Sequence, residues 1–413
     1  MAFSEKAQKI INDFSKQNGV TKEHVNNLKD AILSSPVLNE QFNYVANRGL
    51  LLSLQALPPN SGMGGGFNGQ NKVISISLDQ FSSANYQQEK GDNVFVLGHE
   101  IRHARNNRAM GKATFNYERD LTLEAQKPSP RDYTQEVRKM MAAHKWDEVT
   151  AEIAGNNAVV SMVKEESRNK GTAITLKNIH QVANFRMKDF IEKNGNKYTI
   201  KSNLTPNADL TLSYNSRNIQ GMETNYFDNP DITVGKGKVN YNHYYAASEI
   251  STAMWYEQNE HGKEHNPDPF RIDLKALGLD ESRLERAGIQ LNNPNDRIPY
   301  YDLGRKQHGL FDHTYKTHQH VPVEQTNPVD DRGNKETVDI SKSLDKNASV
   351  QDFNKYGFAA LLSDHDDSRF AALDSMMASN VGQDAERKSR EAVQAYDLEQ
   401  ERIQEMNTLT IKR

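Results

Sequence analysis

The first fifty residues place their apolar side chains three or four positions apart, the spacing of one face of an α-helix. Two such faces consist of Ala7, Ile10, Ile11 and Phe14 and of Val25, Leu28 and Ile32. The pair Ser35-Pro36 joins a capping residue to a proline suited to the first helical position. We therefore predict three short helices within residues 4–48.

The hydrophobic period changes between residues 57 and 81. Residues 57–71 read LPPNSGMGGGFNGQN, a glycine-rich loop without the lysine and hydroxyl residue that end a phosphate-binding loop. In the next segment, KVISISLDQF at 72–81, apolar and polar side chains alternate. This alternation predicts a β-strand with one polar face.

The period of a helix returns near Asp92 or Asn93, where we expect a longer helix to begin. Its apolar stripe is formed by Val94, Leu97, Ile101 and Ala104. A second helix is expected over 133–167, capped by Asp132, unless Gly155 interrupts it. Beyond it the pattern indicates short strands and loops, a helix over 243–258, and irregular structure rich in histidine, proline and asparagine. We expect an α+β fold with four parts: a helical prefix (1–50), a core (51–260), a loop-rich segment (261–345) and a helical C-terminal extension (346–413).

Composition and charge exclude several classes of protein. The net charge of −4 and the pI of about 6.4 supply no basic field that would recruit nucleic acid or an anionic membrane. The chain has no cysteine, so it has no thiolate ligand, cysteine nucleophile or disulfide. Any bound metal must be held by nitrogen and oxygen atoms.

The chain shows no sign of membrane insertion. Its N-terminal segment carries charges where a secretory signal needs an apolar core, and no later stretch approaches the roughly 20 apolar residues of a membrane span. We expect a soluble protein that is cytoplasmic at synthesis and has no Sec-type signal. A mean hydropathy of −0.82 indicates that much of the chain forms exposed helices and long loops.

The sequence HEIRH at 99–103 is the strongest chemical signal. Two histidines four apart on a helix point the same way, so the imidazoles of His99 and His103 can bind one zinc ion. Glu100 can then take a proton from a water that the metal has acidified. Chance alone would produce this motif in roughly one such chain in forty, so its context matters.

Two carboxylates can complete the zinc site. Glu148 and Glu152 lie four apart in WDEVTAEIAGNN and share one face of the second helix. One of them can bind the metal while the other accepts a hydrogen bond from a ligand histidine. Glu118 and Glu124 are weaker alternatives, because nothing at helical spacing supports them.

These residues resemble the zincin metallopeptidases, in particular the glutamate-ligand branch, the gluzincins. HEIRH matches the first zinc motif, and EVTAE at 148–152 looks like the Glu-x-x-x-Asp helix of that branch, with Glu152 where aspartate is usual. The resemblance covers residues 62–165. It implies Glu148 as the third zinc ligand, Glu152 behind His99, and KVISISLD as an edge strand that pairs with an extended substrate.

The resemblance also implies a downstream histidine or tyrosine that stabilises the oxyanion formed when water adds to the scissile carbonyl. His243 is the candidate, because it begins an expected helix after a glycine-rich turn. Tyr244 and Tyr245 are alternatives. Among other histidines, His318 and His320 would share one side of a strand near His308 and His313, although a solvated loop explains them better.

The function expected from these residues is zinc-dependent hydrolysis of amide bonds in a protein or peptide, with Glu100 as general base. The polar, cysteine-free chain resembles bacterial effectors exported by dedicated secretion systems, some of which attack proteins or cell-wall peptides. That likeness predicts an effector toxin with an immunity or inhibitor protein as partner. The alternatives are a housekeeping peptidase and a non-catalytic helical interaction protein.

Overall fold

The computed structural model of the protein describes residues 2–57, 64–235, 238–261, 269–289 and 298–311. The chain divides into two units, Met1–Thr326 and Asn327–Arg413, and every described residue belongs to the first. The helical extension expected over 346–413 lies outside the described residues. The expected prefix and core belong to the same unit.

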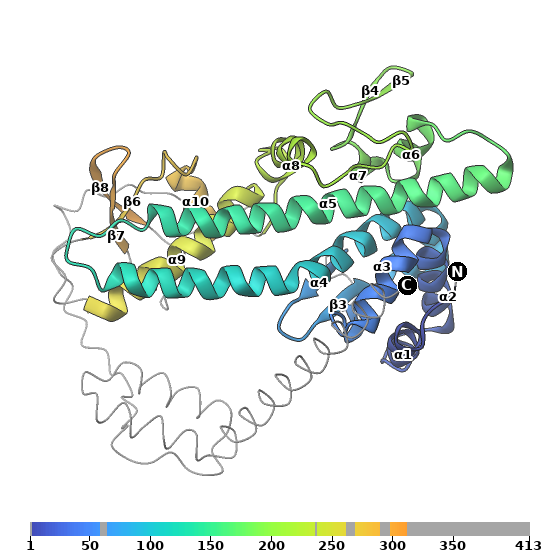
Figure 1. The fold of residues 1–413 in the computed structure, drawn as a ribbon, viewed down its shortest axis with the longest axis horizontal. Helices are drawn as coiled ribbons and strands as arrows, with labels where there is room; N and C mark the ends of the chain where they lie inside the picture. The colour runs from blue at the N-terminus through green and yellow to red at the C-terminus, as the bar shows by residue number, and fades with distance from the viewer. Residues whose placement is uncertain (1, 58–63, 236–237, 262–268, 290–297, 312–413) are drawn as a thin grey trace, which may run out of the picture. The chain divides into compact units, whose positions relative to one another are not determined.

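Helices dominate the described chain, and small sheets accompany them, so its class is α+β (Figure 1). The helices are α1 (Glu5–Phe14), α2 (Lys22–Ser34), α3 (Pro36–Asn47), the 3₁₀ turn η1 (Asp79–Phe81), α4 (Ser83–Ala125), α5 (Thr134–Lys170), α6 (Leu176–Val182), α7 (Asn184–Met187), α8 (Ser216–Met222), the π-helical turn η2 (Glu223–Phe227), α9 (Tyr241–His261) and α10 (Glu281–Ala287). The strands are β1 (Ser53–Leu57), β2 (Gly65–Asn68), β3 (Val73–Ser77), β4 (Ile191–Asn194), β5 (Lys197–Ile200), β6 (Phe270–Ile272), β7 (Ile298–Asp302) and β8 (Gln307–Phe311).

The three predicted N-terminal helices are confirmed, and their caps explain where they begin. The Ser4 hydroxyl accepts from the backbone of α1, Thr21 and His24 form a reciprocal capping box on α2, and Ser35 caps α3. Helix α3 packs against both α4 and α5. The prefix is therefore part of the same hydrophobic core as the long helices.

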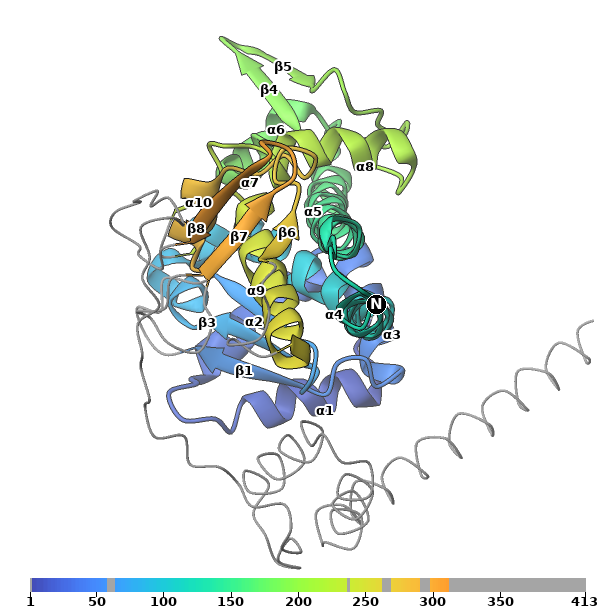
Figure 2. The same ribbon diagram turned by 90° about the vertical axis from the view of Figure 1, so that its left-hand side faces the viewer.

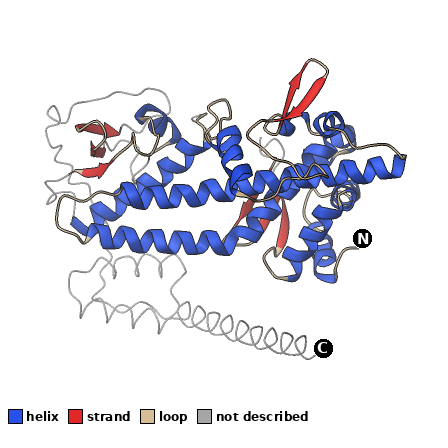
Figure 3. Cartoon of the chain, turned by 45° about the horizontal axis from the view of Figure 1, so that its top comes forward, coloured by secondary structure: helices blue, strands red, loops and turns tan. Residues whose placement is uncertain are grey.

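Two long helices, α4 and α5, run side by side through the fold (Figures 1 and 3). The N-terminal helices and the β1–β3–β2 sheet lie towards one end of this pair, and β6, β7 and β8 lie towards the other. Helix α9 packs on both long helices (Figure 2). Because α4 and α5 pack along each other, side chains from these two separate segments of the chain can meet.

Helix α4 begins at Ser83, nine residues before the start that the apolar period predicted. The added turns are polar in sequence, so periodicity does not reveal them. Their contacts do: the Tyr86 hydroxyl donates to Asp30 at 2.5 Å, and the Lys90 ammonium lies 2.8 Å from the same carboxylate. Tertiary contacts with α2 therefore extend the helix.

Gly155 does not interrupt α5, which is continuous from Thr134 to Lys170. A Cβ atom at this position would lie 2.9 Å from three ring atoms of Phe95 on α4, so the glycine allows the two helices to approach closely. Gly98 has the same role, because a Cβ there would meet the Ala158 Cβ at 3.0 Å. The predicted cap is wrong in position, because the N-cap residue of α5 is Tyr133, which makes no side-chain cap hydrogen bond. Asp132, one residue earlier, accepts from the Thr134 amide at 2.9 Å.

The strand predicted at 72–81 is the shorter β3, and it is not an edge strand. The sheet order is β1–β3–β2, with β3 parallel to β1 and antiparallel to β2. Neighbouring strands thus occupy both sides of β3, and the expected role in pairing with substrate cannot belong to it. Within the described chain, β2 pairs on one side only, and it packs against α4.

The later part of the fold is more regular than the sequence indicated. Among the described residues of 197–240, where we expected short strands and loops, β5 pairs with β4, isolated β-bridges join Pro206 with Leu212 and Val234 with Val239, and helical turns lie between these bridges. The expected irregular segment contains the sheet β6–β7–β8 and helix α10. The helix predicted over 243–258 is confirmed as α9. No helix among the described residues is long and apolar enough to span a membrane.

Candidate metal centre

Three side chains from α4 and α5 bring their metal-binding atoms together. His99 and His103 lie one turn apart on α4, Glu148 faces them from α5, and their ligand atoms all lie within 4.8 Å of one another. The two Nε2 atoms are 2.9 Å apart, and Glu148 Oε2 lies 3.6 Å from His99 Nε2 and 4.0 Å from His103 Nε2. A tetrahedral zinc ion with bonds of about 2.0–2.1 Å keeps its ligand atoms roughly 3.3 Å apart. The group could hold a metal ion with little rearrangement.

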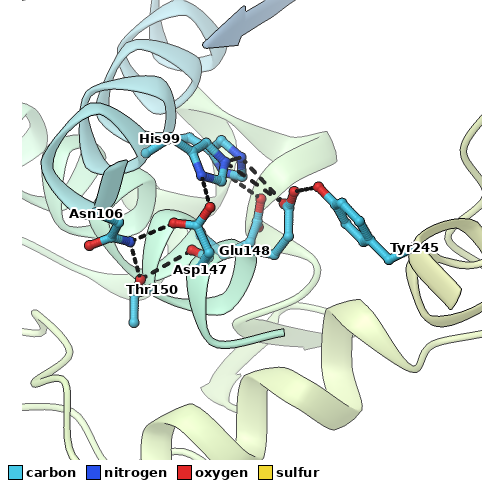
Figure 4. A network of polar contacts seen from close by, with 8 residues as sticks. His99, Asn106, Asp147, Glu148, Thr150 and Tyr245 are labelled. Atoms are coloured by element: carbon cyan, nitrogen blue, oxygen red, sulfur yellow. Dashed lines mark hydrogen bonds and ion pairs between the residues drawn. The ribbon is translucent and has the colours of Figure 1, made fainter. Parts of the chain in front are cut away.

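One oxygen of Glu148 supports this interpretation most directly. Glu148 Oε1 accepts a hydrogen bond from the Tyr245 hydroxyl at 2.5 Å, whereas Oε2 is buried without a hydrogen-bond partner (Figure 4). A buried carboxylate oxygen without a partner is costly. A cation between this oxygen and the two imidazoles would remove that cost. Two nitrogens and one oxygen are also a ligand set that catalytic zinc sites use.

Each ligand histidine is held from behind by a carboxylate of α5. His103 Nδ1 lies 2.9 Å from Asp147 Oδ2, and His99 Nδ1 lies 3.1 Å from Glu152 Oε1, although this second pair lacks the alignment of a hydrogen bond. These contacts leave both Nε2 atoms turned towards Glu148. The structure thus places Glu148 with the metal-binding atoms and Glu152 behind His99.

Asp147 is a site residue that the sequence reasoning missed. Its Oδ1 accepts from Asn106 at 2.8 Å, and Asn106 also donates to Thr150 at 2.9 Å (Figure 4). The sequence held a signal for Asp147. It directly precedes Glu148, and its two partners, His103 and Asn106, lie three positions apart on one helix. Two histidines one turn apart each need a separate carboxylate partner, and the sequence prediction gave one, Glu152, to His99 and none to His103.

The two histidines have opposite pKa shifts. Burial and the neighbouring His103 lower the pKa of His99 to about 4, so its ring is neutral. Burial also disfavours charge on His103, but the bond to Asp147 and the nearby Glu148 outweigh it and raise the pKa of His103 to about 10. Burial raises the pKa of Glu152 to about 7. Metal binding at His103 would therefore compete with a proton.

Glu100, the predicted base, belongs to α4, and its side chain lies close to the neighbouring strand β2. Its side chain is 7% exposed, and its Cγ would lie 3.4 Å from a Cβ added at Gly65 on β2. The charge of Glu100 acts on both ligand histidines, which shows that the three groups are close. The structure thus places the candidate base where α4 packs against the strand β2.

Tyr245 brings α9 into the site. Besides its bond to Glu148, its ring stacks on His144 with centroids 4.2 Å apart and planes 16° apart. His144 Nε2 lies 2.9 Å from Glu249 Oε1, one turn further along α9. Tyr245, named only as an alternative from the sequence, thus contacts Glu148, one of the three clustered side chains.

His243 has a different environment from the one predicted. It is buried, its Nδ1 lies 2.5 Å from the side-chain oxygen of Asn240, and its Nε2 accepts from the Asp280 amide at 3.0 Å. These bonds tie the start of α9 to α10, and both ring nitrogens are used. The contacts described for His243 are thus structural, and its predicted part in oxyanion stabilisation finds no support in them. Tyr244 is 43% exposed and stacks edge-on against Tyr245.

The weaker candidates do not join the cluster. Glu124 binds Lys127 and accepts from the Asp132 amide, and Glu118 is exposed. His308 is exposed beside Tyr301 on the β7–β8 sheet. The rest of the possible second histidine site, His313, His318 and His320, lies outside the described residues.

Comparison of the chain with protein-family models, with characterised proteins and with solved structures found no significant match. What can be concluded about the site therefore depends on its own geometry. That geometry defines a buried two-histidine, one-glutamate group with an acidic side chain behind each histidine.

Proposed function

We propose that the protein is a zinc-dependent peptidase that hydrolyses amide bonds in a protein or peptide. The observation that carries this proposal is the buried, unpartnered Oε2 of Glu148, which lies within 4.0 Å of both ligand imidazoles. Zinc is preferred to magnesium or calcium because two of the three donor atoms are imidazole nitrogens. The HExxH spacing supplies the base that a metal-storage site would not need.

In this proposal His99, His103 and Glu148 would hold the zinc, and a bound zinc would supply Lewis acidity and make a nearby water more acidic. Glu100 takes the proton of the attacking water and returns it to the leaving amine. Asp147 holds Nδ1 of His103 and Glu152 lies 3.1 Å from Nδ1 of His99, so that each Nε2 would face the metal. The Tyr245 hydroxyl holds one oxygen of Glu148, leaving the other for zinc.

The substrate backbone is proposed to add to β2. This strand pairs with β3 on one side, lies against α4, and has Gly65 beside Glu100. An extended peptide joined to the outer edge of β2 by main-chain hydrogen bonds would pass close to the base. A Cβ at Gly65 would also lie 2.8 Å from Val96, so the glycine permits this close approach of strand and helix.

An effector role is part of the same proposal, supported by the polar, cysteine-free composition. A toxin of this kind requires a partner protein that neutralises it in the producing cell. The alternative enzyme is a housekeeping peptidase. Expression separates them, because an effector impairs the growth of a cell that lacks its partner protein.

The decisive variant is Glu100→Gln, which keeps size and hydrogen bonding but removes the base. We expect it to retain one zinc per chain by elemental analysis while losing at least about 100-fold in the cleavage rate of a proteome-derived peptide library, the usual scale of general-base catalysis. We expect it also to relieve any growth defect caused by the wild-type chain.

The matched control is Glu118→Gln, an exposed glutamate on the same helix. It should leave zinc content and cleavage unchanged. A wild-type protein without stoichiometric zinc would disprove the site, and a fully active Glu100→Gln protein would disprove the mechanism.

A further inference from the structure

A row of arginine and tyrosine side chains lies on α3, α4 and the segment before α8. The guanidinium groups of Arg48 and Arg105 lie over the ring of Tyr44, at 5.3 and 4.8 Å from its centroid. The guanidinium of Arg102 lies 4.2 Å from the centroid of Tyr214. Arg48 and Arg105 are exposed, and each tyrosine is 38% exposed. We call these five residues the Arg–Tyr row.

Two of the three arginines share one face of α4, because Arg102 and Arg105 are three positions apart on that helix. Within the described part of the chain, no carboxylate forms an ion pair with Arg48, Arg102 or Arg105, and the buried Nε of Arg102 has no hydrogen-bond partner. The chain has a net charge of −4, so this local concentration of positive charge stands out.

The row reaches the segment that carries the two histidines. Arg102 stands within HEIRH, between Glu100 and His103, and Arg105 follows His103 by two positions on α4. A chain bound along the row would therefore run close to the two histidines.

We propose that the Arg–Tyr row recognises an acidic segment of the substrate next to the bond that is cleaved. This inference rests on the proposed peptidase function. Guanidinium groups bind carboxylates in paired hydrogen bonds, and stacking on tyrosine keeps their planes in place. An acidic peptide fits better than nucleic acid, because three arginines are few beside the roughly 6–10 phosphate contacts of a typical nucleic-acid site.

Peptide binding by the zinc-loaded, full-length Glu100→Gln protein tests the assignment. The probes are a fluorescein-labelled peptide of alternating glycine and aspartate and its glycine–asparagine counterpart, followed by fluorescence anisotropy. We expect the acidic peptide to bind at least about threefold more tightly, and to lose about three- to tenfold in affinity in Arg48→Gln/Arg105→Gln, as expected for two exposed charge contacts. Raising the salt concentration should weaken acidic-peptide binding.

Arg168→Gln is the control, since Arg168 is an exposed arginine that pairs with Glu165 at the end of α5. Equal binding of both peptides, or an equal loss in the control, would refute the row as a recognition surface. Tighter binding of a single-stranded oligonucleotide, lost in the double variant, would assign the row to nucleic acid instead. The binding assay needs no turnover, so the two proposals can fail separately. Peptide cleavage by the wild-type protein without preferential binding of the acidic peptide would refute only the recognition role of the row. Preferential binding of the acidic peptide without any cleavage by the wild-type protein would refute the peptidase function.

Discussion

At the scale of single residues, four acidic side chains of the site have four different environments. Glu148 has an oxygen that accepts no hydrogen bond, Glu152 and Asp147 stand behind the two histidines, and Glu100 lies beside β2. All four come from two helices, so the spacing along each helix decides the role of each carboxylate. Glu148 and Asp147 are adjacent in sequence, and the turn of about 100° between them directs one to the metal and the other to His103.

Asp147 gives a prediction that the sequence alone did not suggest. Asp147→Ala leaves His103 Nδ1 without its carboxylate and frees Asn106, so the imidazole loses its fixed orientation. We expect zinc affinity to fall about 10- to 100-fold, the usual effect of removing such a partner. Competition with a chromophoric chelator measures it. Asp209→Ala, an exposed aspartate paired with Lys164, is the control, and unchanged affinity in Asp147→Ala would contradict the prediction.

The sequence predicted the histidine pair and its glutamates because residues four apart must share a helix face. Spacing alone could not choose between Glu148 and Glu152, since that choice depends on how α5 is rotated against α4; the resemblance to the gluzincins implied Glu148. Tyr245 and His243 illustrate the same limit. Both stand at the start of α9, but only packing decides that Tyr245 turns to Glu148 while His243 binds Asn240 and the Asp280 amide.

At the scale of elements, the approach of α4 and α5 makes the site possible. Gly98 directly precedes His99, and Gly155 follows Glu152 by three positions, so the two helices approach closely beside the clustered side chains. A larger side chain at either position would push the two helices apart. Gly155, which the sequence marked as a possible break in α5, thus supports the geometry of the site.

Replacing Gly155 tests this packing. In Gly155→Ala the new Cβ would lie 2.9 Å from the Phe95 ring, and we expect the free energy of unfolding to fall by about 1–3 kcal/mol, as overpacking does. Gly111→Ala is the control, because a Cβ at that helical position on α4 meets nothing within 4 Å. It should raise stability by about 0.5–1 kcal/mol. Urea denaturation measures both, and a Gly155→Ala protein as stable as Gly111→Ala would contradict the prediction.

The position of β3 within its sheet could not be predicted from hydrophobic periodicity. The alternation in 72–81 correctly predicted β3, but its position inside the sheet depends on pairing with β1 and β2. Those partners carry weak patterns of their own, since β2 is the segment GGFN within a glycine-rich loop. The edge beside Glu100 therefore belongs to a strand that the sequence did not reveal.

At the scale of the whole molecule, a metal at this site would connect the long helices α4 and α5. His99 and His103 belong to α4, which α2 holds at its start, while Glu148 belongs to α5 and is tied through Tyr245 to α9. Without a metal, the buried site contains two close imidazole nitrogens and an unpartnered carboxylate oxygen. The unfolded chain cannot present these three ligands together, so metal affinity adds to folding stability.

Zinc should therefore change the thermal stability of the full-length protein. At a free zinc concentration about 1,000 times the dissociation constant, the gain is about 4 kcal/mol, and we expect chelation to lower Tm by roughly 5 °C or more. Glu148→Ala should abolish the response, whereas Glu152→Ala should reduce it, because Glu152 touches only the far side of His99. Magnesium should give no such shift, since it prefers oxygen ligands in octahedral geometry. If Glu152→Ala abolished the zinc response and Glu148→Ala retained it, the third ligand would be Glu152, and the interface between α4 and α5 would have to rearrange when the metal binds.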